Sequence, residues 1–136
     1  MQISVAEFLE KVSKLKKTQE KVDAIRANDS FVLRTILQGV FDPKVKFLLP
    51  EGDPPYKPND LPDQEHVLIH EARKIQYFVE GFHPNLPQTK REQMFIELLE
   101  NVDPKDAKLL CAMKDKKLPF KGITIQHAVE GLPGLF

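Results

Sequence analysis

Apolar residues in the first part of the chain recur every three to four positions, the spacing that places them on one face of a helix. Val5, Leu9 and Val12 follow this pattern. Ser4 stands just before the pattern and Glu7 follows three residues later, which matches a capping box. We therefore expect a helix that begins directly after Ser4.

Two more short helices are predicted from the same kind of pattern. Thr18 is the expected N-cap of a helix that reaches Asn28, and Ser30 is the expected N-cap of a helix that reaches Val40. Each segment carries its apolar residues mostly on one face. The first forty residues should thus pack as three helices around a shared core.

The composition changes between about residues 42 and 62. This segment cannot form a regular helix, because proline lacks the backbone N–H and its ring clashes with the preceding turn. Apolar residues such as Phe47 precede Pro50, so we expect this part to dock on the helices and the part after Gly52 to be more mobile. Residues 55–58 have the PxxP spacing of a proline-rich ligand, a common chance pattern. Six of the eleven prolines lie here: Pro43, Pro50, Pro54, Pro55, Pro58 and Pro62.

The second half of the chain also has helical periodicity. We predict helices over about 64–80, 88–101 and 103–113, and a last helix that begins at Thr124 and ends near Gly131. No segment has a convincing strand pattern, although residues 44–49 could be extended. The expected fold is all-α, with residues 1–136 forming a single compact domain of six or seven helices and one long proline-rich connection.

His66 and His70 are four residues apart, a spacing that places both on one face of a helix. A zinc-protease motif needs a glutamate directly after the first histidine, but Val67 stands there. We therefore favour an exposed or hydrogen-bonded histidine pair and expect neither a metal nor another cofactor.

Composition limits the cellular setting. The chain has 136 residues, 41% of them hydrophobic, and no apolar run approaches the roughly 18 residues of a membrane-spanning helix. The first residues become charged too early for a signal peptide. The one cysteine, Cys111, lies in an apolar segment and is expected in the core. These features predict a cytoplasmic protein that does not bind membranes.

Charge is unevenly distributed although its total is zero. Residues 105–121 contain six lysines and two aspartates. Lysines neutralise phosphates, and a glycine lets a backbone approach a partner closely, so the loop 114–124 is the expected binding segment. We expect its contacts from Lys114, Lys116, Lys117, Lys121 and Gly122, helped by Lys90 and Arg91, which should be exposed on the helix over 88–101.

The order of several segments resembles the all-helical N-terminal DNA-binding domain of phage-type ATP-dependent DNA ligases. The resemblance extends over nearly the whole chain, which is also similar to small stand-alone proteins of unknown function from large tailed phages. The segments that carry it are Lys21–Asp29, Ala72–Ile75, Phe95–Leu99, and Gly122–Thr124 through to Pro133–Leu135.

The ligase resemblance implies that the turn before the last helix approaches the minor groove and backbone of duplex DNA. The matching positions here are Lys116, Lys117, Lys121, Gly122 and Thr124. General physical chemistry agrees, since ammonium groups and the amides at a helix N-terminus attract phosphates. Changing the three lysines to glutamate should then abolish DNA binding and leave the fold intact.

No catalytic role is expected. The chain lacks a Lys-x-Asp-Gly nucleotidyl-acceptor motif, its length leaves no room for a nucleotidyltransferase domain, and its acidic pairs lie on ordinary helix faces. The sequence therefore predicts a non-enzymatic accessory protein of a phage that binds duplex DNA, largely without regard to base sequence.

A different class of function is also open. Residues 131–136, Gly-Leu-Pro-Gly-Leu-Phe, resemble the short apolar C-terminal peptides that bind sliding clamps. In this alternative the protein is an interaction module for a host or phage replication or transcription factor. In the ligase-like interpretation, which we favour, the same residues pack on the domain.

Overall fold

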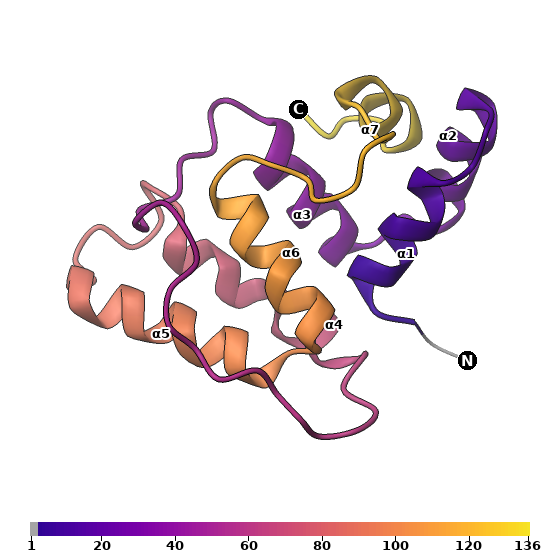
Figure 1. Ribbon diagram of the computed structural model, residues 1–136. Helices are drawn as coiled ribbons and strands as arrows, with labels where there is room; N and C mark the ends of the chain where they lie inside the picture. Colours follow the sequence, from indigo (N-terminus) through magenta and orange to yellow (C-terminus); the bar gives the residue numbers. More distant parts are fainter. Residues whose placement is uncertain (1–2) are drawn as a thin grey trace.

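The computed structural model describes residues 3–136, and its regular structure is helical throughout (Figure 1). No strand is found within that range, where Phe47 and Val79 form an isolated antiparallel bridge. The prediction of an all-α domain with six or seven helices is confirmed. The elements are α1 (Val5–Ser13), α2 (Thr18–Ala27), α3 (Phe31–Phe41), α4 (Val67–Glu71), the 3₁₀ helix η1 (Ala72–Phe78), α5 (Gln88–Asn101), α6 (Pro104–Lys114) and α7 (Ile125–Gly131).

Two of the predicted helix starts are confirmed at atomic detail. The Ser4 hydroxyl accepts a hydrogen bond from the Glu7 amide at 3.1 Å, and the Ser30 hydroxyl accepts one from Leu33 at 3.2 Å. The predicted cap of α2 was wrong by one residue. Lys17 is the N-cap, because Glu20 turns back to accept a hydrogen bond from its amide at 3.2 Å.

The predicted helix over 64–80 is shorter and changes type. It is α-helical only through α4, and η1 then continues as the tighter 3₁₀ form. The chain leaves η1 in an extended conformation at Val79, which lets Val79 pair with Phe47. Helix η1 therefore ends at Phe78, where the next residue, Val79, pairs with Phe47 of the proline-rich connection.

The proline-rich connection has hydrogen-bond partners on other elements both before Pro50 and after Gly52. Before Pro50, the Leu48 amide donates to the Phe78 carbonyl at 2.8 Å, so this part docks on η1 as predicted. The part after Gly52 was expected to be more mobile, yet it also has partners on α5. The Lys57 amide donates to Glu100 at 2.8 Å, and the Asn59 side chain donates to the Asn101 carbonyl at 3.0 Å.

Helix α6 lies at the centre of the fold. Helices α1, α3 and α5 all pack against it, and Leu109, Leu110 and Met113 are fully buried there. Cys111 is buried as predicted, and burial raises the pKa of its thiol to about 12. The core is thus built around one helix contacted from several sides.

One buried carboxylate joins α6 to the start of α1. Asp106 has no exposed surface, and its Oδ1 accepts a hydrogen bond from the Ala6 amide at 2.8 Å. Its Oδ2 has no hydrogen-bond partner among the described residues. Burial raises the pKa of Asp106 to about 7.

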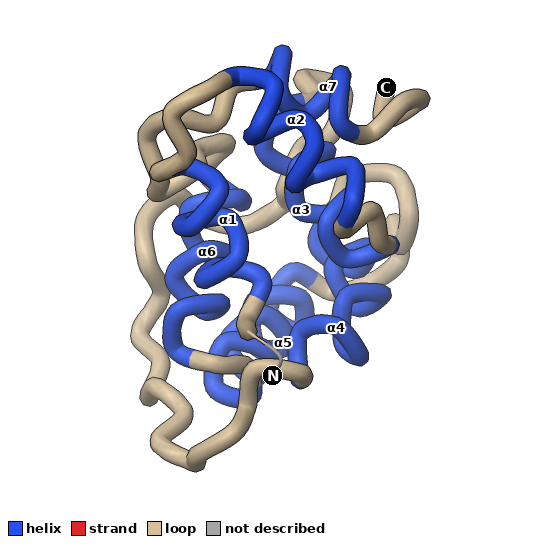
Figure 2. The backbone as a smooth tube through the Cα atoms, turned by 90° about the vertical axis from the view of Figure 1, so that its right-hand side faces the viewer, coloured by secondary structure: helices blue, strands red, loops and turns tan. Residues whose placement is uncertain are grey.

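Helix α7 packs beside α2, so the last helix closes the fold against an early one (Figure 2). The contact is close, because a Cβ on Gly131 would lie 2.6 Å from a methyl carbon of Ile25. Leu132 and Leu135 are buried, and Arg34 donates to the Pro133 carbonyl at 3.1 Å. The tail therefore packs on the domain, as the favoured interpretation predicted.

None of the helices in residues 3–136 is long and apolar enough to cross a membrane.

Candidate nucleic-acid interface

The loop 114–124, called the basic loop below, begins with a tight turn after α6. The Lys116 amide donates to the Met113 carbonyl and the Lys117 amide donates to the Ala112 carbonyl, each at 2.9 Å. This is the Schellman pattern that ends many helices. Lys116 takes the left-handed position with φ of 62°, which glycine usually occupies. A lysine at this position needs a compensating contact.

The side chain of Lys116 provides that contact. Its ammonium group donates to the carbonyls of Gly39, Asp42 and Val45, the last two at 2.8 Å. All three ammonium hydrogens are thereby used, and they join the Gly39 carbonyl in the last turn of α3 to the carbonyls of Asp42 and Val45 that follow it. Burial of the ammonium lowers the pKa of Lys116. Lys116 is exposed, but its ammonium is held by these carbonyls and is not free to reach a phosphate, contrary to the sequence-based prediction. We therefore expect that changing Lys116 affects the fold.

Lys114 is also part of the interior. Its side chain is 1% exposed and forms an ion pair with Asp115 at 2.8 Å. The other oxygen of Asp115 accepts a hydrogen bond from the Gly52 amide at 3.2 Å, which anchors the proline-rich connection. Lys114 therefore cannot present its charge to a phosphate, contrary to the sequence-based prediction.

Arg91 was expected to be exposed, but it is 5% exposed. Its guanidinium donates to the carbonyls of Tyr77 and His83, both at 3.0 Å, and to the Gln88 side chain at 2.8 Å. These bonds tie α5 to the end of η1 and to the turn between them. Arg91 is a structural residue, and its predicted role in binding was wrong.

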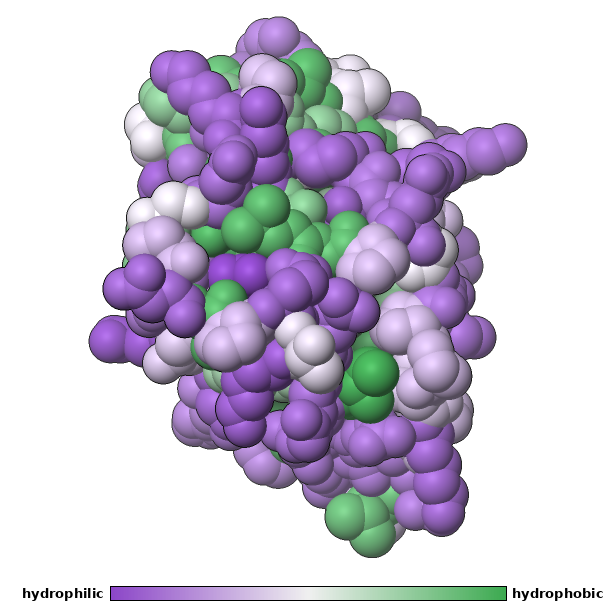
Figure 3. Space-filling model, turned by 90° about the vertical axis from the view of Figure 1, so that its left-hand side faces the viewer, coloured by the Kyte–Doolittle hydropathy of each residue, from purple (hydrophilic) through white to green (hydrophobic). Residues whose placement is uncertain are grey.

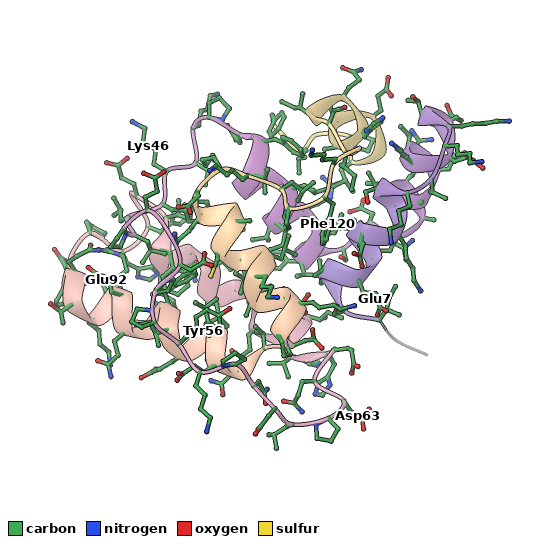
Figure 4. The ribbon with its side chains drawn as sticks, viewed as in Figure 1. Glu7, Lys46, Tyr56, Asp63, Glu92 and Phe120 are labelled. Atoms are coloured by element: carbon green, nitrogen blue, oxygen red, sulfur yellow. The ribbon has the colours of Figure 1, made fainter. Side chains whose placement is uncertain are left out.

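Lys90 is exposed, as predicted, in the first turn of α5. This end of α5 lies far from the basic loop. Figure 4 shows Glu92, one turn away from the helix start, at the left of the molecule, and Phe120 of the basic loop to the right of its centre. Lys90 therefore cannot add to a surface formed by the loop.

Gly122 packs closely against another part of the protein, the end of α1. It has φ of 109°, and a Cβ at this position would lie 2.7 Å from the Ser13 carbonyl oxygen at the end of α1. The Lys21 ammonium of α2 donates to the Gly122 carbonyl. The glycine thus seats the basic loop against α1 and α2, whereas the sequence had indicated an approach to DNA.

Thr124 begins α7 as predicted. Its amide donates to Nδ1 of His127 at 3.0 Å, so His127 occupies the capping-box position. Burial and the nearby Lys21 lower the pKa of His127, which favours the neutral ring that this bond requires. The cap leaves the Thr124 side chain exposed.

The turn between α1 and α2 carries charge that the sequence analysis missed. Lys14, Lys16 and Lys17 are exposed, and none forms an ion pair among the described residues. The signal was present, since residues 11–21 hold five lysines and one glutamate. The Gly122 contact with Ser13 places this turn beside the end of the basic loop. We call Lys14, Lys16, Lys17, Lys117 and Lys121 the basic surface.

The histidine pair does not belong to a metal cluster. His66 and His70 meet edge to face with ring centres 5.8 Å apart. No group of three or more metal-ligating side chains occurs in residues 3–136.

A family model matches residues 8–119, which extend from α1 into the basic loop. The chain belongs to DUF6433, a family of unknown function. The DUF6433 match includes Lys14, Lys16, Lys17 and Lys117 and ends before Lys121. No curated protein and no solved structure matches the chain.

The chemistry available to the basic surface is electrostatic. Its five side chains are exposed ammonium groups on flexible stems, two of them on the basic loop and three on the turn between α1 and α2. Such groups attract phosphates as point charges and do not read base edges in a fixed geometry. The arrangement suits a polyanion with regularly spaced charges.

Proposed function

We propose that this protein binds the backbone of duplex DNA through the basic surface, without catalysis and largely without regard to base sequence. The observation that carries the proposal is the contact between Gly122 and Ser13. It joins two lysine-rich segments that lie about a hundred residues apart in the sequence. A chain with no net charge thereby concentrates positive charge at one place, which is the electrostatic footprint of a nucleic-acid binder.

The ligase resemblance supports the same surface. It implies that the turn before the last helix faces DNA, and Lys117 and Lys121 are the exposed lysines of that turn. The turn between α1 and α2 adds charge that the buried Lys114 and the carbonyl-bound ammonium of Lys116 do not offer to a phosphate. We further propose that the protein is an accessory factor of a phage, acting where duplex DNA is replicated, repaired or packaged.

The proposed affinity depends strongly on salt. Each phosphate neutralised on duplex DNA contributes roughly −0.9 to the slope of log K against log salt, so five lysines allow a slope of about −4.5. The experiment is a fluorescence anisotropy titration of labelled duplexes, nicked and intact, at about 50 mM and about 150 mM salt. Saturable binding that weakens steeply with salt is the expected result.

Two variants divide the basic surface. The turn variant carries Lys14→Glu, Lys16→Glu and Lys17→Glu, and the loop variant carries Lys117→Glu and Lys121→Glu. Because these side chains are exposed, both variants should keep the helical circular dichroism and the unfolding midpoint of the parent protein. Both should lose most DNA affinity, since each one reverses the charge of part of the same surface.

A control variant carries Lys44→Glu, Lys57→Glu and Lys90→Glu, which are exposed lysines outside the basic surface. It changes the net charge as much as the turn variant does and should lose much less affinity. Equal losses in the two variants would show that net charge alone governs binding and would overturn the proposed surface. Absence of binding by the parent protein at low salt, up to about 10⁻⁴ M protein, would overturn DNA binding itself.

A further inference from the structure

An apolar groove lies between α3, residues 45–47 and η1. It has a volume of about 510 Å³, within the range of roughly 300–1,000 Å³ found for ligand sites. Figure 3 views the molecule from the left-hand side of Figure 1 and shows hydrophobic residues near the middle of that face, bordered by hydrophilic ones. The apolar residues that line the groove include Phe31, Val45, Phe47, Ile75, Val79 and Phe82.

Two aromatic rings in the lining of this groove face solvent. Phe31 is 59% exposed and Phe82 is 61% exposed, although neither is needed to complete the buried core. Exposed aromatic rings beside an apolar groove are typical of protein-interaction sites, where they anchor a partner. Because these rings leave the groove open to solvent, its shape suits a segment of a larger molecule better than an enclosed small ligand.

One charged group at the groove has no partner. The Arg73 guanidinium lies 5.8 Å from the centre of the Phe31 ring, and it forms no ion pair or hydrogen bond among the described residues. Lys44 and Lys46, on either side of Val45, are exposed as well. On η1 and α4, Lys74 neutralises Glu71 at 2.7 Å, which leaves Glu80 as the exposed acid near Lys46. The rim is therefore positively charged on balance.

We propose that the groove binds an acidic segment of a partner protein, with apolar side chains in the groove and a carboxylate on Arg73. An arginine that is already held over an aromatic ring loses little freedom when it binds a carboxylate, which it can grip with two parallel hydrogen bonds. A peptide suits this site better than nucleic acid does, because the groove inside the charged rim is lined mainly by apolar side chains. The groove and the basic surface share no residue, although Lys116, the neighbour of Lys117, contacts the groove residues Gly39, Val45 and Phe47.

The test uses a displayed library of random peptides about 16 residues long, enough for roughly four helical turns. Peptides are selected on the parent protein and depleted on a variant with Phe31→Ala and Phe82→Ala. Both rings are exposed, so this variant should unfold at the same midpoint as the parent. The expected survivors combine two or more large apolar residues with at least one aspartate or glutamate.

The charge contact is then tested with the best peptide in a fluorescence anisotropy titration. Arg73→Glu should weaken binding about tenfold or more, the usual effect of losing a hydrogen bond to a charged group. Replacing the peptide's acidic residue by lysine should restore part of the affinity for the Arg73→Glu protein. The controls are Lys90→Glu, which changes an exposed charge on α5, and Leu61→Ala, which removes an exposed apolar side chain.

Several results would overturn the proposal. They are a library without enrichment, survivors that are neutral or basic, and an Arg73→Glu protein that binds as well as Lys90→Glu. A dimer of the parent protein in sedimentation velocity, lost on changing both phenylalanines to alanine, would show that a second copy of the chain covers the groove instead.

Discussion

At the residue scale, Lys116 combines a left-handed backbone with an ammonium group that is held by three carbonyls, although the residue as a whole is exposed. Its left-handed φ costs about 1 kcal/mol for a residue with a side chain, and its ammonium satisfies three carbonyls in return. Such a lysine stabilises the join between α3, the proline-rich connection and the end of α6, and it is unavailable for binding.

Lys116→Met should therefore lower the free energy of unfolding by about 1–3 kcal/mol, because carbonyls at the end of α3 lose their donor. Lys116→Gly should cost less, since glycine relieves the left-handed strain. Urea unfolding measures both, and Lys117→Met is the matched control on an exposed neighbour. A Lys116→Met protein as stable as Lys117→Met would contradict the cap.

Asp106 makes a second residue-scale prediction, which concerns pH. Its pKa is about 7 in the folded protein, whereas the ordinary value for an aspartate is 3.8, so between these values only the folded chain holds the proton. The stabilising contribution of this group is complete below about pH 4 and disappears as the pH rises through 7.

Asp106→Asn removes this titration while it keeps an oxygen for the Ala6 amide. Relative to the parent protein, the variant should gain on the order of 2 kcal/mol of stability between pH 5 and pH 8. Urea unfolding of the parent protein and of the variant at both pH values measures the difference between their free energies of unfolding. Other titrating groups contribute equally to both proteins and so cancel from this difference. A constant difference across this range would show that Asp106 is already ionised in the fold.

At the scale of elements, the helices were largely predictable and the roles of their charged residues were not. Apolar spacing and the caps at Ser4 and Ser30 are local signals, so they located α1 and α3 correctly. The fates of Lys116 and Arg91 depend on carbonyls supplied by other elements. For Lys116 these partners lie more than seventy positions away, beyond the reach of any local pattern.

For the candidate interface, the charge of each segment was predictable from the sequence, but the position of the two segments side by side was not. The charge of the basic loop is visible in the sequence, and so is the charge of residues 14–17. Their adjacency is not visible, because it results from the contact that Gly122 makes with Ser13.

Gly122 provides the prediction that belongs to this scale. Gly122→Ala should destabilise the protein by more than Gly134→Ala, because both positions have positive φ but only Gly122 faces a backbone oxygen at 2.7 Å. The expected difference is about 1–3 kcal/mol, the usual cost of overpacking. Thermal unfolding of the two variants measures it, and equal losses would show that the basic loop does not need this contact.

At the scale of the whole molecule, zero net charge conceals two opposite regions. Residues 11–21 and 105–121 are positive, whereas residues 51–103 contain eleven acidic and five basic side chains. The acidic part includes α5, which lies on the opposite side of the molecule from α1 and α2 (Figure 1). Such a distribution orients the protein as it approaches a charged surface.

Ion-exchange chromatography at neutral pH and low salt should reveal this polarity. The parent protein should be retained on a cation exchanger despite its zero net charge, through the basic surface. The turn variant should elute earlier than the control variant, although both carry the same net charge. Identical elution of the two variants would show that charge is not concentrated in the way that the structure places it.

The packing of α7 on α2 also has a consequence for how the chain is made. Ile25 is buried early in the sequence, yet Gly131 closes over it only near the end. While the chain is being synthesised, the faces of α2 that await α7 stay open to water until residues 125–135 have emerged. Folding should therefore be completed late, and a nascent chain halted before α7 should present exposed apolar surface to chaperones and proteases.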